Sequence, residues 1–421
     1  MEKYVIEGGR KLSGEISVSG AKNQALIVIA AAVLSEAVCT IKNVPDIEDI
    51  NRLVEILEDL GASVERSDHQ LIINPAKINK TEPTAELVHK LRSSVMLAGP
   101  LLARFGEVTM AHPGGCVIGQ RPINMFLSGF QALGAEVIEN EHQYTLRAKK
   151  LKGAKIIMPW IAVTATEALM MTACLAEGTT TIVNAAMEPE IPTLAEYLNS
   201  CGAKISGAGT PIITIDGVKK ISGGTCTLIP DRIEAGSFVI MGLATGSKIK
   251  VTDLNPSHLE TVIVNLQKAG ANLEIGPDYI ITKPSDLKGI ELRTHEYPGF
   301  PTDLQAPFTV LMTQAKGISL IHETIYEGRL FYTDKLNQMG AHIIMCDPHR
   351  IIVNGPAQLS GRKLESPDLR AGMALVIAGL IATGKTAVEN IYQIERGYEN
   401  IISRLKKLGA NIDKIDDCLV K

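Results

Sequence analysis

The sequence lacks several features that mark common protein classes. It has no run of basic residues, and its 42 lysines and arginines against 46 aspartates and glutamates give a net charge of -4. Such a chain offers no extended positive field to a nucleic-acid backbone, so no nucleic-acid partner is expected. No stretch approaches the ~20 consecutive apolar residues of a membrane span, and the opening residues MEKYVIEGGRKLSG contain no apolar segment typical of a secretory signal. We therefore expect a soluble, cytoplasmic protein without membrane contact.

Metal and nucleotide motifs are also missing. The cysteines show no CxxC pair and no Cys/His spacing typical of zinc, which favours a reducing compartment and no metal site. The glycine-rich segments match neither GxxxxGK[ST] nor a GxGxxG that opens a helix after a strand. P-loop hydrolysis and Rossmann-type hydride transfer are therefore disfavoured, and no cofactor is expected. The seven cysteines lie at positions 39, 116, 174, 201, 226, 346 and 418.

Aromatic residues are scarce in a chain long enough for a large core or several smaller ones. Among 421 residues there are one tryptophan, seven phenylalanines and nine tyrosines, although 45% of the residues are hydrophobic. The core must therefore be built from Ala, Val, Ile and Leu, a composition that suits helices packed on strands.

The strongest pattern present is a six-fold internal repeat. A motif of Leu, two or three mixed residues, Gly-Ala and an alternating apolar stretch recurs with spacings of 73, 68, 68, 70 and 69 residues. A second marker of the type KLSG keeps the same period, with a degenerate copy near Ile78. Two markers in one register indicate a repeat architecture. The motif glycines are Gly61, Gly134, Gly202, Gly270, Gly340 and Gly409.

Each repeat is predicted to fold as β-α-β-α-β-β. In the last repeat, for example, DLRAGMALVIAGLIATG has apolar residues at helical spacing and ends at Gly384, a favoured helix C-cap. The Ala-rich first helices look buried on most sides, and units of this size cannot bury their faces alone. We therefore expect an α/β fold with helices inside and sheets outside.

Three repeats per domain give two domains, and the chain begins and ends in the same one. The first domain is expected to contain residues 1–21 and 230–421, and the second residues 22–229, including the segment around Cys116. A ligand site is expected in the cleft between the two domains.

Lys22 and Asn23, in SGAKNQAL, begin an otherwise apolar helix near the first predicted domain crossing. A cation at a helix N-terminus opposes the helix dipole unless an anion lies there too. Lys22 is therefore a candidate anion ligand. The alternative is a lysine whose amino group extends from an apolar stem to solvent.

Cys116 lies in the glycine-rich segment AHPGGCVIGQRP, with Arg121 five residues later. A nearby cation stabilises a thiolate or binds an anion. This pattern fits a lid that carries an acid or a nucleophile. The structural alternative is a turn with a small buried residue.

Asp303 follows two stiffening prolines in YPGFPTDLQ, at the start of a predicted helix. It is either a helix N-cap, the commoner role for Asp in such a place, or a rigidly held general base.

Several arginines lie at turns or equivalent repeat positions. PDRIEAG and PDLRAG occupy the same place in different repeats and put an acid and a base beside inner helices. Converging arginines suggest a polyanionic substrate, most simply a phosphate. The arginines are Arg92, Arg232, Arg329, Arg370 and Arg396.

These motifs together carry a resemblance to a known family. GAKN at 20–23, PGGC at 113–116, IPDRIEAG at 229–236, YPGFPTDLQ at 297–305, DLRAG at 368–372 and ERGYE at 395–399 occur in this order. The chain resembles the UDP-N-acetylglucosamine enolpyruvyl transferases from end to end. The resemblance implies a two-domain inside-out α/β barrel and the first committed step of peptidoglycan synthesis, without a redox cofactor. The shikimate-phosphate enolpyruvyl transferases share the repeats but are not expected to have the PGGC segment.

The resemblance also implies residue roles. Cys116 matches the general acid that protonates the phosphoenolpyruvate methylene and that fosfomycin alkylates, and Asp303 matches the base near the sugar 3-hydroxyl. Asn23 matches a hydroxyl or phosphate contact. The cations matched to phosphoenolpyruvate are Lys22, Arg121 and Arg396, with Arg92 and Arg370 nearby.

Two segments depart from the family pattern on the nucleotide-sugar side. A Lys-x-Ser-Val-Gly-Ala-Thr-like segment is replaced from Trp160 to Thr166, and an acid and an imidazole are replaced by Asn124 and Phe126. Both changes put the identity or the affinity of the acceptor in question. The residues expected to contact the acceptor are Pro122, Ile123, Asn124, Met125, Trp160, Ala162, Val163, Thr164 and Ile325.

Three functional hypotheses follow. The first is enolpyruvyl transfer from phosphoenolpyruvate to UDP-N-acetylglucosamine. The second is the same reaction with another nucleotide or nucleotide-sugar. The third is a weakly catalytic regulatory paralogue, which the presence of Lys22, Cys116, Asp303 and Arg396 opposes because a pure binder needs neither an acid nor a base.

Overall fold

The protein folds into two compact units. The computed structural model describes residues 2–114, 118–119 and 123–416. The first unit contains the described residues of 1–19 and 230–421 together with Ile118 and Gly119, and the second contains residues 20–114 and 123–229. Among the residues singled out above, Cys116, Arg121 and Pro122 lie outside the described residues.

The repeats are built on the predicted β-α-β-α-β-β unit, except that the described part of the second repeat lacks the first strand, and the third repeat shows the pattern in full. Its first two strands are parallel and flank a helix, while its last two form an antiparallel hairpin that pairs back onto the second strand. The strand order within the sheet is therefore first, second, fourth, third. The elements are β9 (Lys155–Ile157), α6 (Val163–Ala173), β10 (Thr179–Val183), α7 (Glu190–Ser200), β11 (Lys204–Ser206) and β12 (Ile212–Asp216).

The motif glycines terminate the second helix of every repeat. All six adopt positive φ, a conformation that glycine reaches without steric cost. The backbone therefore explains the repeat marker: a residue with positive φ is needed where the chain turns from the helix into the next strand. Their φ angles are 105° at Gly61, 92° at Gly134, 101° at Gly202, 93° at Gly270, 102° at Gly340 and 91° at Gly409.

The second unit has one irregular repeat. Its second repeat contributes a three-stranded sheet with the order β6-β8-β7, whereas the described part of each other repeat contributes to a four-stranded sheet. In the described residues 75–84, where the repeat marker is degenerate, no strand forms, and the short helices α3 and η2 follow this stretch. The remaining elements of this unit are α1 (Lys22–Ala31), η1 (Ala32–Leu34), β3 (Cys39–Lys42), α2 (Glu48–Asp59), β4 (Ser63–Ser67), β5 (Gln70–Asn74), α3 (Ala85–Lys90), η2 (Arg92–Leu97), α4 (Ala98–Phe105), β6 (Glu107–Ala111), α5 (Asn124–Ala132), β7 (Glu136–Glu139), β8 (Gln143–Arg147) and β13 (Thr225–Thr227).

The first unit is assembled from both ends of the chain. The N-terminal strand β1 lies between β22 and β23 and completes the sheet of the sixth repeat. The elements are β1 (Glu2–Glu7), β2 (Ser13–Ser17), α8 (Arg232–Ala244), β14 (Lys248–Thr252), η3 (Pro256–Leu259), α9 (Glu260–Lys268), β15 (Asn272–Ile275), β16 (Tyr279–Lys283), β17 (Glu291–Arg293), η4 (Thr302–Leu304), α10 (Gln305–Met312), β18 (Gly317–His322), α11 (Thr333–Gln338), β19 (Ile343–Asp347), β20 (Arg350–Gly355), β21 (Lys363–Glu365), α12 (Leu369–Ile381), β22 (Lys385–Glu389), α13 (Tyr392–Glu395), α14 (Ile401–Lys407) and β23 (Asn411–Asp416).

The two units exchange a strand at each crossing. Strand β2 precedes α1 in the chain but pairs with β14 of the first unit. Strand β13 precedes α8 but pairs with β3 of the second unit. The first strand of each crossing repeat is therefore left behind in the unit from which the chain departs.

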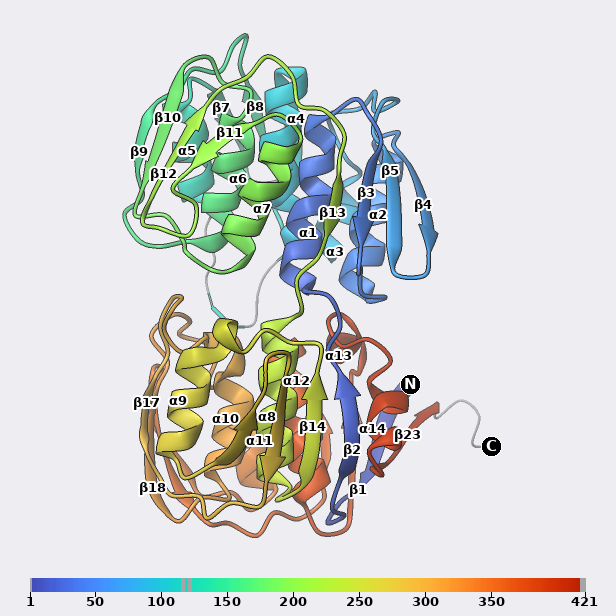
Figure 1. Ribbon diagram of the computed structural model, residues 1–421, viewed down its shortest axis with the longest axis vertical. Helices are drawn as coiled ribbons and strands as arrows, with labels where there is room; N and C mark the ends of the chain where they lie inside the picture. Colours follow the sequence, from blue (N-terminus) through green and yellow to red (C-terminus); the bar gives the residue numbers. More distant parts are fainter. Residues whose placement is uncertain (1, 115–117, 120–122, 417–421) are drawn as a thin grey trace. The chain divides into compact units, whose positions relative to one another are not determined.

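The first helix of each repeat forms the interior of its unit. In α8 every residue from Ile233 to Ala244 is buried, and in α1 every residue except Asn23 is buried. The second helices are amphipathic; α2, for example, buries Ile50, Leu53, Ile56 and Leu57 on one face. Figure 1 shows the strands on the outside of each unit, with the inner helices running through it. The predicted inside-out α/β arrangement is confirmed, and the inner helices are α1, α4 and α6 in the second unit and α8, α10 and α12 in the first.

One inner helix carries a buried carboxyl group. Glu167 of α6 is 2% exposed, and Glu188 and Glu190 lie near it. Burial and then the charges of Glu190 and Glu188 raise the pKa of Glu167 well above its usual range. Between the unfolded and the folded pKa, unfolding releases a proton, so this group lowers stability as pH rises.

We expect Glu167→Gln to stabilise the protein, with a gain that grows from about pH 5 to pH 8 as the unfolded carboxyl ionises. Urea unfolding of the wild type and the variant across this range measures the gain. A gain that shrinks with rising pH would contradict the assignment of a raised pKa to Glu167.

Candidate active site

Lys22 begins the inner helix α1 and is 9% exposed. Its Nζ lies 2.7 Å from Oδ2 of Asp49, which stands in the first turn of α2 and is 3% exposed. The alternative of a lysine extended to solvent is therefore wrong. The anion that a cation at this helix end requires is a protein carboxylate, which the sequence did not single out. Asn23 is exposed beside it.

Arg92 and the start of α5 flank the segment that contains Cys116. Arg92 is half-buried at the start of η2, and its guanidinium donates to the carbonyl of Gly114 at 3.2 Å. Asn124 is exposed and Met125 half-buried in the first turn of α5, while Ile123 and Phe126 are 7% exposed and pack in the core.

The segment before α6 presents an aromatic side chain to solvent. Trp160 is 57% exposed, and Ala162, Val163 and Thr164 are half-buried at the start of the helix. Thr166 instead points inward, where its hydroxyl donates to the carbonyl of Ala162 at 2.9 Å and accepts from the amide of Ala186 at 3.0 Å.

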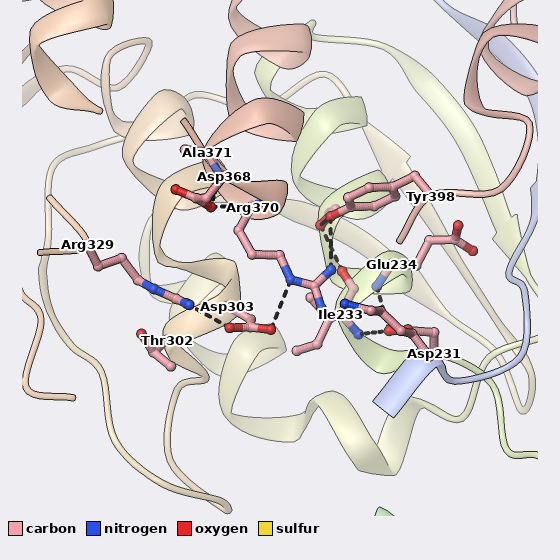
Figure 2. A network of polar contacts seen from close by, with 12 residues as sticks. Asp231, Ile233, Glu234, Thr302, Asp303, Arg329, Asp368, Arg370, Ala371 and Tyr398 are labelled. Atoms are coloured by element: carbon pink, nitrogen blue, oxygen red, sulfur yellow. Dashed lines mark hydrogen bonds and ion pairs between the residues drawn. The ribbon is translucent and has the colours of Figure 1, made fainter. Parts of the chain in front are cut away.

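Asp303 lies in the turn η4, directly before the inner helix α10, and joins two arginines (Figure 2). Its Oδ1 lies 2.7 Å from a terminal nitrogen of Arg329, and its Oδ2 lies 2.9 Å from Nε of Arg370. A quarter of the Asp303 side chain is exposed, while the Arg329 and Arg370 side chains are 7% and 6% exposed. Asp303 makes no side-chain cap, so the N-cap interpretation is wrong.

The two arginines fix the protonation state of Asp303. Burial alone would raise the pKa of its carboxyl group, but the charges of Arg370 and Arg329, with their hydrogen bonds, outweigh burial and hold that pKa far below its usual range. The pKa of Arg370 is raised because the attraction of Asp303 outweighs its own burial. Asp303 is therefore a carboxylate at every physiological pH.

The acids of PDRIEAG and PDLRAG are helix caps. Oδ1 of Asp231 accepts from the amides of Ile233 and Glu234 at 2.8 and 3.0 Å. Oδ1 of Asp368 accepts from the amides of Arg370 and Ala371 at 2.8 and 3.0 Å. The equivalent positions thus share a capping function, and the cap at Asp368 fixes the turn that presents the Arg370 side chain to Asp303 (Figure 2).

Tyr398 supports Arg370 from the side opposite Asp303. Its hydroxyl lies 3.4 Å from a terminal nitrogen of Arg370 and 3.0 Å from Oγ of Ser237, and the guanidinium carbon lies 5.8 Å from the ring centroid. Tyr398 is 1% exposed. Tyr398 belongs to the ERGYE motif, but nothing in one sequence indicates its contact with a residue 28 positions away.

Three further candidates lie in the first unit. Arg396 is half-buried at the end of α13 and donates to Oε1 of Gln393 at 3.0 Å. Ile325 is half-buried in the loop after β18. Arg232, in the first turn of α8, has its guanidinium carbon 5.6 Å from the ring centroid of Tyr297. Within the same unit, the amide of Gly328 donates to the carbonyl of Ile118 at 2.9 Å.

Neither a metal site nor a membrane span accompanies these groups where the structure is described. Over residues 2–114, 118–119 and 123–416, no set of three or more His, Cys, Asp or Glu side chains is placed to hold a metal ion. Across the same residues, none of the helices has both the length and the apolarity needed to cross a bilayer.

Comparison with known proteins shows the family of this chain. The family model described as EPSP synthase (3-phosphoshikimate 1-carboxyvinyltransferase) matches residues 6–405. The UDP-N-acetylglucosamine 1-carboxyvinyltransferase of Desulfosudis oleivorans is 42% identical and covers 99% of this chain and 100% of its own length. The UDP-N-acetylglucosamine 1-carboxyvinyltransferase 2 of Bacillus cereus is 45% identical over 98% of this chain and 96% of its own. The chain belongs to the family of the UDP-N-acetylglucosamine 1-carboxyvinyltransferases.

Solved structures place the 1-carboxyvinyltransferase fold in a wider group. The enolpyruvyl transferase NikO from Streptomyces tendae has a TM-score of 0.89 at 25% identity and covers 98% of both chains. EPSP synthase from Acinetobacter baumannii has a TM-score of 0.75 at 18% identity, covering 99% of this chain and 100% of its own, and thus shares the fold. The family resemblance and the fold inferred from the sequence are both confirmed. As a member of this 1-carboxyvinyltransferase family, the protein is an enolpyruvyl transferase.

We expect Arg370→Met to lower the free energy of unfolding by about 3 kcal/mol, the low end for breaking a buried ion pair because Arg329 remains. The loss should be largest near neutral pH. The folded pKa of Asp303 lies below its unfolded value, so the pair stabilises the fold above the unfolded pKa of ~3.9 and loses this effect as pH falls.

Urea unfolding at neutral and acidic pH measures this change. Arg350→Met is the matched control, because Arg350 is 55% exposed and pairs with Asp347 at the surface, where an ion pair contributes little. Equal losses in the two variants would contradict a buried, strongly coupled Asp303–Arg370 pair.

Proposed function

We propose that the protein transfers the enolpyruvyl group of phosphoenolpyruvate to the 3-hydroxyl of UDP-N-acetylglucosamine and releases phosphate. The observation that carries this proposal is the full-length similarity, at 42 to 45% identity, to proteins named for that acceptor. The reaction is the first committed step of peptidoglycan synthesis, and no redox cofactor or metal takes part in it.

We propose that cations among the candidate residues bind phosphoenolpyruvate, the donor of the enolpyruvyl group. We assign Lys22, Arg121 and Arg396 to phosphoenolpyruvate, with Arg92 and Arg370 nearby. What supports the assignment of Lys22 is its place in the first turn of the inner helix α1, where Asp49 fixes the position of its amino group. Helix N-termini attract phosphate through their unpaired amides and the helix dipole. Fixed cations then stabilise the phosphate and carboxylate charges during the reaction.

The bond changes are an addition followed by an elimination. The thiol of Cys116 gives a proton to the methylene carbon of phosphoenolpyruvate, which makes the adjacent carbon electrophilic. The sugar oxygen adds to that carbon and loses its proton towards Asp303. The methyl group of the tetrahedral intermediate then returns a proton to the thiolate of Cys116 as the bond to the phosphate oxygen breaks. Phosphate leaves, and the proton on Asp303 passes to the phosphate or to solvent.

The electrostatics of Asp303 define when it can accept the proton. A carboxylate with a strongly lowered pKa is a weak base for a free hydroxyl group. It can still orient the 3-hydroxyl through a hydrogen bond. Proton transfer becomes favourable only as the new carbon–oxygen bond forms and the hydroxyl becomes acidic. We therefore propose that Asp303 orients the acceptor first and takes the proton late.

The acceptor side carries the specific differences of this chain. Asn124 and Trp160 are both exposed, and each replaces a residue that is usual in the family. A nucleotide-sugar would contact these positions together with Pro122, Ile123, Met125, Ala162, Val163, Thr164 and Ile325. These differences support a second candidate, in which another nucleotide or nucleotide-sugar accepts the enolpyruvyl group.

We also propose a cytoplasmic location, because Cys116 must remain a free thiol to act as an acid and a reducing compartment keeps thiols free.

We expect the purified protein to release phosphate from phosphoenolpyruvate when UDP-N-acetylglucosamine is added. The same assay is run with a panel of other nucleotides and nucleotide-sugars. It is also run with the variant Trp160→Lys, which restores the lysine usual in the family at this position on the acceptor side. Release with UDP-N-acetylglucosamine supports the proposal. Release only with a different acceptor would establish the second candidate, and no release with any acceptor would favour a regulatory paralogue.

We expect Cys116→Ser to lose turnover and alkylation by fosfomycin, because a hydroxyl is a far weaker acid than a thiol. Cys116→Asp supplies another proton donor and should retain turnover while escaping the drug. Phosphate release and mass spectrometry after drug treatment measure both effects. Full activity of Cys116→Ser would remove Cys116 from its proposed role as the acid.

A further inference from the structure

The position directly after the second strand of a repeat is strongly patterned. In four repeats this position holds an Asn or Asp with positive φ, a conformation that these side chains tolerate. Three of them donate from the side-chain amide to the carbonyl of the residue that follows the strand paired in parallel with the second strand, at 3.0 to 3.1 Å. The fourth accepts from a hydroxyl at the end of that parallel neighbour, at 2.6 Å. The four residues are Asn43, Asn184, Asp253 and Asn390.

The fifth repeat departs from this pattern at Glu323. Glu323 follows the second strand β18, and it does not have positive φ. The connection to the first strand passes to the next residue: the amide of Thr324 donates to Oγ1 of Thr294 at 2.9 Å, and the Thr324 hydroxyl donates to the Thr294 carbonyl at 2.6 Å. Thr324 therefore makes the hydrogen bonds to the neighbouring strand that the Asn or Asp makes in the other four repeats, and the Glu323 side chain does not take part in them.

The Glu323 carboxylate joins two segments of the candidate site instead. It is fully buried. Oε2 accepts from the hydroxyl of Thr302, the residue before Asp303, at 2.8 Å. Oε1 accepts from the amides of Ile325 and Tyr326 at 2.9 and 3.2 Å. One buried side chain thus connects the turn that carries Asp303 with the loop that carries Ile325 and leads to Arg329.

The backbone of Glu323 is anchored as firmly as its side chain. Its amide donates to the carbonyl of His349 at 2.7 Å, and its carbonyl lies 2.7 Å from Nδ1 of His349. After Asp303, the carboxylate of Glu323 is the next largest contribution that raises the pKa of Arg329. The group therefore lies close enough to the site to influence its charges as well as its geometry.

We propose that Glu323 is a positioning residue for enolpyruvyl transfer, which holds the Asp303 turn and the 324–329 loop in the register that the reaction needs. It acts through Thr302 and the amides of Ile325 and Tyr326 and does not contact substrate. This inference rests on the proposed function. It adds to that function a residue that neither the repeat pattern nor the motif set had indicated.

Three substitutions separate positioning from charge and from folding. Glu323→Asn restores the residue type usual at this position and should fold, but its side chain is too short to reach both segments. Glu323→Ala removes every side-chain bond. Glu323→Gln keeps the geometry, because its oxygen can accept from both amides and its NH₂ can donate to the Thr302 hydroxyl, while it removes the charge.

We expect kcat to fall about 100-fold in Glu323→Asn and Glu323→Ala, the loss typical of a displacement of about 1 Å at reacting groups. Glu323→Gln should retain most of kcat. The assay is phosphate release at saturating phosphoenolpyruvate and UDP-N-acetylglucosamine, well below the unfolding temperature of each variant. Thr302→Val should show part of the same loss, and its effect should not add to that of Glu323→Ala.

Asp253→Gly is the matched control, because it removes the side chain at the equivalent position of another repeat and glycine keeps positive φ without strain. Its kcat should match the wild type. Wild-type kcat in Glu323→Asn or Glu323→Ala would overturn the proposal, and so would a loss in Glu323→Gln as large as in Glu323→Ala. An inactive wild type would instead overturn the proposed function itself.

Discussion

The constraint on which the structure depends is the apolar character of the first helix in each repeat. Such a helix has no surface face, so each unit must enclose three of them behind its sheets. Few polar residues lie inside these helices; Glu167 of α6 and Ser237 of α8 are examples. The candidate residues lie instead towards the N-terminal ends: Lys22 at α1, Thr164 at α6, Arg232 at α8, Asp303 before α10, Arg370 at α12 and, one short helix before α4, Arg92.

This arrangement explains why cations occupy helix ends that repel them. The N-terminus of a helix carries partial positive charge and favours anions. Lys22 and Arg370 are stable there because Asp49 and Asp303 supply full negative charges at 2.7 and 2.9 Å. Each cation thus lies within its own unit beside a carboxylate that holds its side chain in one orientation.

Much of the fold could be predicted from the sequence, because the repeat markers have a local physical cause. The glycines of the LxxxGA motif need positive φ, and that need is visible in one residue. The absence of a first strand from the described part of the second repeat was not predicted, because the marker near Ile78 still resembles the other copies of the repeat. The candidate site residues were proposed from the sequence, but the ion pairs and hydrogen bonds between them and their partners were not. Three residues of these pairs were not predicted: Asp49, Glu323 and Tyr398. Each contacts a partner 21 to 28 positions away in the chain, and no local sequence pattern encodes such a contact. The N-cap interpretation of Asp303 was wrong for the same reason, because its partners Arg329 and Arg370 lie 26 and 67 positions away.

Because the units exchange strands, the two units are completed at different times during synthesis of the chain. The second unit is finished once β13 has been made, so everything it requires lies between residues 20 and 229. The first unit cannot close at that stage. Its strand β1 is among the first segments made, yet it must wait for β22 and β23, which are the last. During synthesis, which proceeds at about 5–20 residues per second, the second unit can therefore be complete while the N-terminal strands are still unpaired. A ribosome that stalls before β23 would leave one finished unit joined to one with an open sheet edge.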